Sequence, residues 1–246
     1  MRLLAIGDIH GCLQTLEGLI DQVQPTKKDQ VIFLGDYIDQ GPSSKGVIDY
    51  LIKFGRRFPQ TVFLRGNHEQ MMLEAWHYRG RPAKVRETLD SWDWQSLYRT
   101  SKEYAVSMGG PKYVEAVWIN NGGFPTLESY GHRPPPEEHL RFLINTKLYF
   151  ETDKYIFAHA GCDRQDRLAE TDPFTFLWHP YMCRFRGDGA PLKTVVVGHR
   201  VETKPFFAEY WVALDTGCGC GFYLTCADLL TGQVFQEKNE IGETQK

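Results

Sequence analysis

Short apolar runs alternate with amphipathic segments through the first third of the chain. The apolar runs predict strands at residues 2–7, 30–34 and 61–64, and the amphipathic segments predict helices at 12–23, 43–54 and 69–76. Strands that alternate with helices imply crossover connections, which are typical of a parallel sheet. The pattern therefore predicts an α/β core in this part of the chain.

The last third has a different pattern, in which strands follow one another after short connections. Strands are predicted at residues 147–151, 155–159, 194–198, 206–214, 221–227 and 233–236. Closely spaced strands favour antiparallel pairing, because a short turn can join only antiparallel neighbours. We therefore expect a second, more antiparallel sheet, and an α/β fold with α+β character.

The segment between these parts, residues 77–136, reads as a mostly helical insertion in a single domain that spans residues 1–237. Three consecutive prolines close it, and four of the six tryptophans lie in it or just before it: Trp76, Trp92, Trp94 and Trp118. We expect these aromatic side chains to pack the insertion on the body of the domain, in preference to lining a binding surface. Its basic residues Arg79, Arg81, Lys84 and Arg86 are expected to form a solvated face; the alternative is that they steer an anionic substrate.

Composition and charge narrow the classes of protein. Of 246 residues, 42% are hydrophobic and 24% charged, which excludes a disordered or fibrous chain. The net charge of −3 argues against general nucleic-acid binding. No apolar run is long enough for a membrane helix, and the apolar start meets Asp8 too soon for a signal peptide. The six scattered cysteines predict no disulfide framework, so we expect a cytoplasmic protein, with a frayed tail at 238–246.

Five short polar segments carry the candidate chemistry. Each places Asp, Asn or His at or just after the end of a predicted strand, usually beside glycine, at residues 7–11, 35–41, 66–69, 159–161 and 198–199. A single strand-end Asp is more often a helix cap, and a lone His more often packs, so each segment alone is a weak signal. Their recurrence at the ends of strands, where α/β folds build sites, indicates one shared site.

The types of side chain in these segments favour transition metals. Carboxylates, imidazoles and an amide supply oxygen and nitrogen donors without a thiolate. Such a set suits Mn²⁺, Fe or Zn²⁺, whereas Ca²⁺ prefers oxygen ligands alone. An Asp can bridge two cations, and two cations about 3.5–4 Å apart can deprotonate a shared water for in-line attack on phosphorus.

The ordered motifs GD-x-HG, GD-x-x-D-x-G, GNHE, HAG and GH resemble those of the metal-dependent phosphoprotein phosphatases within the calcineurin-like metallophosphoesterases. The resemblance runs from Arg2 to about Phe235, and it is strongest to short bacterial Ser/Thr protein phosphatases and symmetrical dinucleoside-tetraphosphate hydrolases. A segment from Leu214 to Cys218 also resembles these proteins. The resemblance implies two β-sheets packed as a sandwich and flanked by helices, in four layers αββα, with a dinuclear site at one rim.

The resemblance also implies a role for each motif residue. Asp8 and His10 would bind the first metal, Asp36 would bridge, and Asn67, His159 and His199 would bind the second. His68 would be the general acid that protonates the leaving oxygen, with Asp39 fixing its orientation and charge. The implied cofactors are two divalent transition-metal ions, Mn²⁺ first, with Fe or Zn²⁺ as alternatives.

The phosphate-binding residues depart from the family pattern. Gln40 stands where the family has an arginine that contacts phosphate. Arg65, just before the Gly66–Glu69 segment, fits a phosphate clamp, and Arg184 and Arg186 lie in the region of a second family arginine. Arg200, directly after His199, could replace the missing charge; the alternative is that it points to solvent beside Glu202.

The sequence thus predicts metal-dependent hydrolysis of a phosphoester. We expect a phosphomonoester on Ser or Thr of a phosphorylated protein, and we keep two alternatives open. One is a hydrolase of dinucleoside polyphosphates or other nucleotides, and the other is a binding module whose site has decayed at Gln40. Cys218, Cys220 and Cys226 lack a fourth zinc ligand, so alternation in a predicted strand hairpin explains their spacing better than a zinc site.

Overall fold

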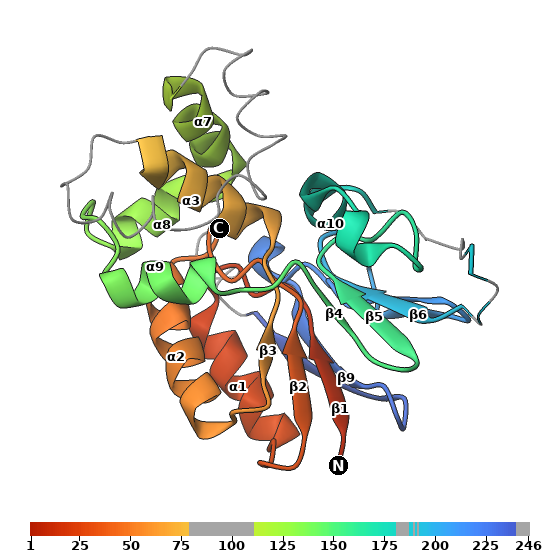
Figure 1. Ribbon diagram of the computed structural model, residues 1–246. Helices are drawn as coiled ribbons and strands as arrows, with labels where there is room; N and C mark the ends of the chain where they lie inside the picture. The colour runs from red at the N-terminus through yellow and green to blue at the C-terminus, as the bar shows by residue number, and fades with distance from the viewer. Residues whose placement is uncertain (79–110, 181–186, 189, 191, 240–246) are drawn as a thin grey trace.

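Two mixed β-sheets lie face to face in the computed structural model, with helices on the outside (Figure 1). The structure describes residues 1–78, 111–180, 187–188, 190 and 192–239. The first sheet has the strand order β10-β9-β1-β2-β3. In it β1 (Leu3–Ile6), β2 (Gln30–Phe33) and β3 (Val62–Phe63) are parallel, whereas β9 (Tyr223–Asp228) and β10 (Gln233–Lys238) add an antiparallel hairpin beside β1.

The second sheet has the order β4-β5-β6-β8-β7. Its strands are β4 (Tyr149–Glu151), β5 (Tyr155–Ala158), β6 (Thr194–Val197), β7 (Phe206–Ala208) and β8 (Trp211–Ala213). The three central strands β5, β6 and β8 are parallel, and the edge strands β4 and β7 are antiparallel to their neighbours.

The sequence pattern predicts one second sheet that contains all strands of the last third and is mainly antiparallel. Both expectations need correction. The last two strands belong to the first sheet, and the second sheet is parallel at its centre. Residues 206–214 form the hairpin β7–β8 in place of one strand. Local hydrophobicity marks a strand but does not choose its partner, which depends on the buried faces of strands far along the chain.

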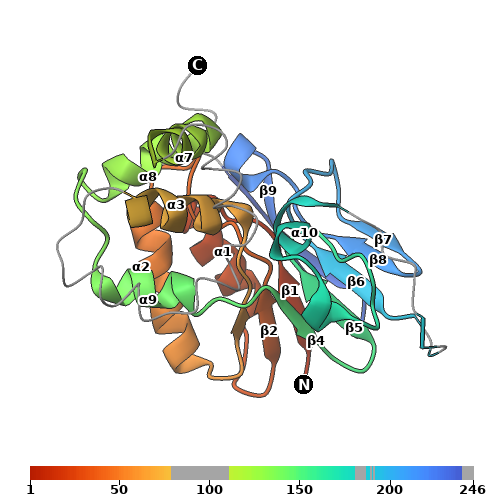
Figure 2. The same ribbon diagram turned by 45° about the horizontal axis from the view of Figure 1, so that its top comes forward.

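Side-chain alternation in β1 explains why the first sheet has two buried faces. Leu4 and Ile6 pack on the helical side, whereas Ala5 faces the second sheet. The layer between the sheets is apolar and closely packed, and it contains Ala5, Ile32, Leu34, Val62, Leu64, Phe157, Val196, Val212, Leu214 and Ala227. This arrangement confirms the expected two-sheet sandwich flanked by helices (Figure 2).

The helices lie mainly on the outer face of the first sheet. They are α1 (Leu13–Val23), α2 (Ser44–Arg57), α3 (Asn67–Tyr78), α7 (Pro111–Trp118), α8 (Phe124–Ser129) and α9 (Glu137–Ile144). In α1 the buried residues Leu16, Leu19, Ile20 and Val23 follow the helical period that one apolar face requires. The short helix α10 (Pro173–Trp178) covers the other sheet, where Phe176 packs with Ile156 and Val195.

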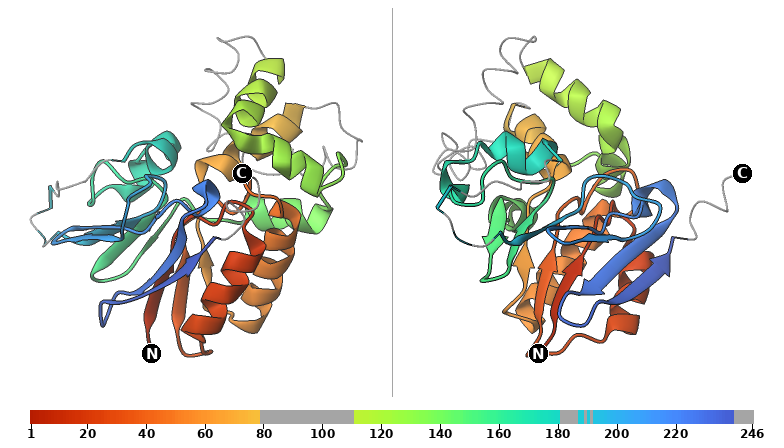
Figure 3. Two further views of the ribbon diagram at one scale, coloured as in Figure 1. Left: turned by 180° about the vertical axis from the view of Figure 1, so that it is seen from behind. Right: turned by 90° about the vertical axis from the view of Figure 1, so that its right-hand side faces the viewer.

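The described residues of the insertion include two α-helices. They contain α7, a π-helical turn at Ile119–Gly123 and α8, which lie above α1 and α2 in Figure 1 and can be followed from behind in Figure 3. Trp118 is fully buried in the main core cluster. The predictions for Trp92, Trp94, Arg79, Arg81, Lys84 and Arg86 fall outside the described residues.

The cysteine hairpin differs from expectation. Strand β10 includes Lys238, and the buried Asn239 donates to the carbonyl of Cys218 (2.8 Å). Cys218–Cys220 is a 3₁₀ turn and only Cys226 lies on a strand. Within the described residues, no helix is long and apolar enough to cross a membrane.

Candidate metal centre

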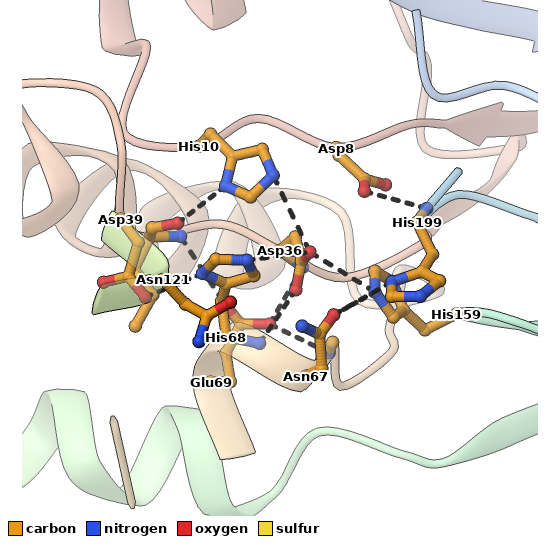
Figure 4. A network of polar contacts seen from close by, with 12 residues as sticks. Asp8, His10, Asp36, Asp39, Asn67, His68, Glu69, Asn121, His159 and His199 are labelled. Atoms are coloured by element: carbon orange, nitrogen blue, oxygen red, sulfur yellow. Dashed lines mark hydrogen bonds and ion pairs between the residues drawn. The ribbon is translucent and has the colours of Figure 1, made fainter. Parts of the chain in front are cut away.

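Strands from both sheets end at one rim, and a polar residue follows each end within four positions. From the first sheet come Asp8 after β1, Asp36 after β2 and Asn67 after β3; from the second come His159 after β5 and His199 after β6. Figure 4 shows these side chains converging from separate loops. The structure thus brings together all eight residues predicted as ligands or catalytic groups, namely Asp8, His10, Asp36, Asp39, Asn67, His68, His159 and His199. Their individual roles stay predictions.

The carboxylate of Asp36 lies at the centre of the cluster. Its Oδ2 is 3.3 Å from His159 Nε2 and 3.7 Å from His10 Nε2. Two groups of potential metal donors share this carboxylate, one with His10 and His68 and the other with His159 and His199; within each group the donor atoms lie within 4.8 Å of one another. A bridging position for Asp36 fits this geometry.

Asn67 belongs to the second group. Its Oδ1 lies 2.8 Å from His159 Nε2 and 3.1 Å from His199 Nδ1. Burial lowers the pKa of His199 to about 4, and the neighbouring His159 acts in the same direction. Burial likewise lowers the pKa of His10 to about 4. Both imidazoles are therefore neutral near pH 7, which is the form that binds a metal.

Asp8 provides the test of whether cations fit. Its Oδ2 accepts a hydrogen bond from the backbone N–H of His199 (2.9 Å), but its buried Oδ1 has no hydrogen-bond partner. Burial raises the pKa of Asp8 well above its usual range, and the charges of Asp215 and Asp36 add to the effect. A buried carboxylate oxygen without a partner costs free energy that a cation would recover. The residues present therefore fit two divalent cations.

The backbone around these residues is strained. Of seven described non-glycine residues with a positive φ, five belong to the site: His10, Asp36, Asp39, Gln40 and His199. Each such conformation costs about 1–3 kcal/mol and persists only where surrounding contacts impose it. Two glycines allow the close approach: a Cβ on Gly66 would lie 2.0 Å from Asp36 Oδ1, and one on Gly198 would lie 2.0 Å from Asp8 Oδ1.

Glu69 is a supporting residue to which the sequence analysis gave no role, although it lies in the quoted GNHE motif. Its buried carboxylate accepts hydrogen bonds from the backbone N–H groups of Asp36 (2.9 Å), Tyr37 (2.8 Å) and Gly66 (2.9 Å). Burial raises the pKa of Glu69 to about 7, and the charge of Asp36 contributes. Glu69 thereby ties the loop that carries Asp36 to the start of α3.

Asp215 is a second residue that lacked an assigned role. It follows β8 by two positions, and its carboxylate lies in a cavity at the same rim as His10, Asp36 and His199. It accepts a hydrogen bond from the backbone N–H of Gly217 (2.9 Å). Burial raises its pKa to about 6. The other site residues were recognised as Asp, Asn or His just after the end of a predicted strand. Asp215 meets the same criterion and could have been recognised in the same way.

His68 and Asp39 form a hydrogen-bonded pair. His68 Nδ1 lies 2.8 Å from Asp39 Oδ2. Burial lowers the pKa of His68, but the charge of Asp36 and the hydrogen bond with Asp39 outweigh it and raise the pKa to about 9. The Asp39 carboxylate also accepts hydrogen bonds from Trp118 and Thr126, which belong to the insertion, and the backbone N–H of Asp39 donates to Ser44 Oγ.

The structure places the side chain of Arg65 in the core, away from the cavity, and so gives no support to the expected phosphate clamp. Its guanidinium is buried and donates to Thr146 Oγ1 (3.1 Å), Gln70 Oε1 (3.0 Å) and the carbonyl of Ile144 (2.7 Å). The buried guanidinium holds the end of α9 against the start of α3. Position directly before a motif does not reveal toward which side a side chain turns.

The structure places the other candidate phosphate-binding residues, Arg200 and Gln40, in different surroundings. Arg200 is 70% exposed and its Nε lies 3.5 Å from Glu202 Oε1, which is the alternative that the sequence analysis left open. Gln40, in contrast, lies beside the metal-centre residues and lines the cavity that they form. Arg184 and Arg186 fall outside the described residues.

A cavity of about 210 Å³ opens between the donor groups and solvent. Besides the metal-centre residues, Gln40, Asn121, Trp178, Val201 and Cys220 line it. Within the described part of the chain, no lysine or arginine lines this cavity.

Comparison with known proteins agrees with this geometry. The family model of the calcineurin-like phosphoesterases matches residues 1–201. The chain belongs to the calcineurin-like phosphoesterase family. The expectation of a metallophosphoesterase is therefore confirmed.

Curated relatives are similar over nearly the whole chain. A symmetrical bis(5'-nucleosyl)-tetraphosphatase from Vibrio cholerae is 25% identical, covering 89% of this chain and 92% of the relative. An asymmetrical bis(5'-nucleosyl)-tetraphosphatase, PrpE from Oceanobacillus iheyensis, is also 25% identical, with coverages of 92% and 87%.

Solved structures confirm the fold. A crystal structure described as that of "a putative diadenosine tetraphosphatase" superposes with a TM-score of 0.65 at 18% identity, covering 98% of this chain and 95% of the other. A Ser/Thr phosphatase from Saccharomyces cerevisiae gives a TM-score of 0.53 at 14% identity, with coverages of 98% and 80%. These likenesses show the fold and leave the substrate open.

Metal removal should destabilise the protein, because the ligands come from loops of both sheets and can bind a cation together only when folded. We expect close to two transition-metal ions per chain by elemental analysis, and a Tm that falls by on the order of 5–10 °C after chelation. Asp36→Ala should abolish most of this metal-dependent stabilisation. Asp153→Ala, which removes an exposed acid between β4 and β5, is the control. An unchanged Tm and no bound metal would refute the metal centre.

Arg65→Met should unfold more easily, because it leaves the carbonyl of Ile144 and the hydroxyl of Thr146 without their buried donor. We expect the free energy of unfolding to fall by about 3 kcal/mol or more in urea denaturation. Arg200→Met removes an exposed arginine and should change it by less than about 0.5 kcal/mol. If Arg65→Met instead had wild-type stability and a raised KM for substrate, Arg65 would bind phosphate after all.

Proposed function

We propose that the protein hydrolyses dinucleoside polyphosphates, with a phosphoanhydride as the scissile bond. The observation that carries this proposal is an aromatic wall beside the metal centre. Trp178 lines the cavity, and its ring lies 6.1 Å from that of His199, nearly perpendicular to it. Phe174, which is 43% exposed, stacks on Trp178 at 6.0 Å. Exposed aromatic faces stack on nucleobases, which a phosphoserine or phosphothreonine side chain does not offer.

The named relatives support the same substrate class. Both symmetrical and asymmetrical bis(5'-nucleosyl)-tetraphosphatases resemble this chain over most of their length. Hydrolysis of phosphoserine or phosphothreonine, which we favoured on sequence alone, has no comparable support, because the Ser/Thr phosphatase shares only the fold. The relatives therefore favour dinucleoside polyphosphates, the alternative substrate class that the sequence leaves open.

The charges of the cavity also fit a polyphosphate once cations are bound. Asp36 together with His10 on one side, and with Asn67, His159 and His199 on the other, would hold two divalent ions, which would supply positive charge and lower the pKa of a bound water. His68 is then left to donate its proton. The amide side chains of Gln40 and Asn121 line the same cavity and can donate hydrogen bonds to phosphoryl oxygens. Gln40 stands at the position where the resemblance implies an arginine, and Asn121 adds a second amide to the same cavity.

The chain's own residues then divide the work of hydrolysis. As the oxygen of a water that has released one proton to solvent bonds to phosphorus, the bond from phosphorus to the bridging oxygen breaks. His68 donates its Nε2 proton to that departing oxygen, and Asp39 holds the imidazole through Nδ1. His68 Nε2 lies 3.9 Å from Asp36 Oδ2, so the proton faces the centre of the site.

A substrate panel tests the proposed class. With Mn²⁺ present, we expect kcat/KM for diadenosine tetraphosphate to exceed that for phosphoserine and phosphothreonine peptides by about 100-fold or more, because only the dinucleotide gains base stacking and polyphosphate contacts. Chromatography of the products separates symmetrical cleavage, which gives two ADP, from asymmetrical cleavage, which gives ATP and AMP. Faster turnover of the phosphopeptides would overturn the proposal.

Trp178→Ala tests the aromatic wall directly. Loss of one stacking face, worth about 1–3 kcal/mol, should lower kcat/KM for diadenosine tetraphosphate by about 5- to 150-fold. Hydrolysis of p-nitrophenyl phosphate, which has no nucleobase, should change by less than about 3-fold. Phe207→Ala, which removes an exposed phenylalanine on the edge strand β7, is the matched control. Equal losses on both substrates would mean that Trp178 only supports His199.

A further inference from the structure

The insertion reaches the catalytic pair through two buried side chains. We propose that Trp118 and Thr126 are positioning residues that orient the Asp39 carboxylate and, through it, the proton-donating imidazole of His68. The inference rests on phosphoester hydrolysis by the site and does not depend on the nucleotide preference proposed above. It gives the insertion a part in catalysis in addition to the packing role expected from the sequence.

Trp118 contacts both oxygens of the carboxylate. Its indole N–H lies 2.9 Å from Asp39 Oδ2 and 3.1 Å from Oδ1, so it donates a bifurcated hydrogen bond. Oδ2 is also the oxygen that bonds His68 Nδ1 at 2.8 Å. The indole therefore fixes the rotation of the oxygen that holds the imidazole.

Thr126 holds the same residue at two points. Its hydroxyl donates to Asp39 Oδ1 (2.6 Å) and accepts from the backbone N–H of Asp39 (2.9 Å). Ser44 also accepts from that N–H at 3.0 Å, and its hydroxyl lies 2.8 Å from that of Thr126. Backbone and side chain of Asp39 are thus clamped together, at a residue whose φ is +71° and therefore strained.

These bonds are needed because no solvent reaches the carboxylate. The exposed fraction of Asp39 is 0%, and burial raises its pKa, whereas the bonds from His68, Thr126 and Trp118 lower it. A buried carboxylate with too few donors would turn toward other partners or take up a proton. In either case it would no longer hold the imidazole at Nδ1.

The turn between α7 and α8 sets the distance between the two donors. Gly122, at φ +95°, presents its carbonyl to the backbone N–H of Gln40 (2.9 Å), the residue after Asp39. A Cβ on Gly123 would lie 2.6 Å from the Trp118 ring, so glycine is required there for the indole to keep its place. The Asn-Asn-Gly-Gly segment therefore docks the insertion onto the loop that carries Asp39.

Leaving-group dependence separates positioning from simple packing. A general acid matters most when the departing oxygen is a poor leaving group, so its loss slows phenyl phosphate more than p-nitrophenyl phosphate. Trp118→Phe keeps an aromatic ring in the core but removes the N–H. We expect kcat for phenyl phosphate to fall by about 10-fold, the scale of one lost charged hydrogen bond, with kcat for p-nitrophenyl phosphate and both KM values within about 3-fold of wild type.

Matched variants test the same point. Thr126→Val should behave like Trp118→Phe, whereas Thr126→Ser, which keeps the hydroxyl, should retain activity on both esters. Trp211→Phe changes a buried indole on the outer face of the second sheet and should leave both rates unchanged. In a His68→Asn background, Trp118→Phe should cause no further loss, because it acts through the missing imidazole.

A readout without turnover completes the test. In wild-type protein with metal bound, the proton shared by His68 Nδ1 and Asp39 should give a downfield ¹H NMR resonance, which should shift or broaden in Trp118→Phe and stay in Trp211→Phe. An unchanged resonance, or equal rate losses on both esters, would overturn the positioning role. Inactivity of the wild type on every phosphoester would instead reject the proposed function, and the resonance would still decide whether Trp118 positions the pair.

Discussion

Repulsion between buried carboxylates is the constraint on which this structure depends. Asp8, Asp36, Glu69 and Asp215 are each at most 2% exposed and meet at one rim. Backbone N–H groups neutralise part of this charge, most clearly at Glu69, while the orphan Oδ1 of Asp8 shows that protein donors do not meet all of it. Two divalent cations would neutralise the remaining negative charge. Folding of the rim is therefore coupled to metal binding.

Part of the site can be predicted from sequence by a single topological rule. Polar residues directly after parallel strands must meet, and this holds for Asp8, Asp36 and His159 whatever the details of packing. The positions of α1, α2 and α3 and of most strands follow from local periodicity in the same way, whereas α9 and α10 were not predicted. The pairing of β9 with β1 does not, because it depends on which buried face another strand leaves uncovered.

The direction in which a side chain points could not be predicted from the sequence. Arg65 precedes the motif by one residue yet turns into the core, where the end of α9 supplies acceptors for its guanidinium. Trp118 lies about 80 residues from Asp39 and reaches it through a turn that no local pattern links to the site. In both cases the deciding contact is with a segment distant in sequence, so only the folded chain reveals it.

The second donor group takes its side chains from both sheets, and this has a consequence for the apolar layer between the sheets. Asp36 and Asn67 are carried by the first sheet, and His159 and His199 by the second, so the sandwich interface sets their separation. Ala5 lies in that layer with no exposed surface. A larger side chain there would wedge the sheets apart and alter the spacing of the ligands without touching any of them. Metal affinity in this protein is thus a property of its hydrophobic core as much as of its polar rim.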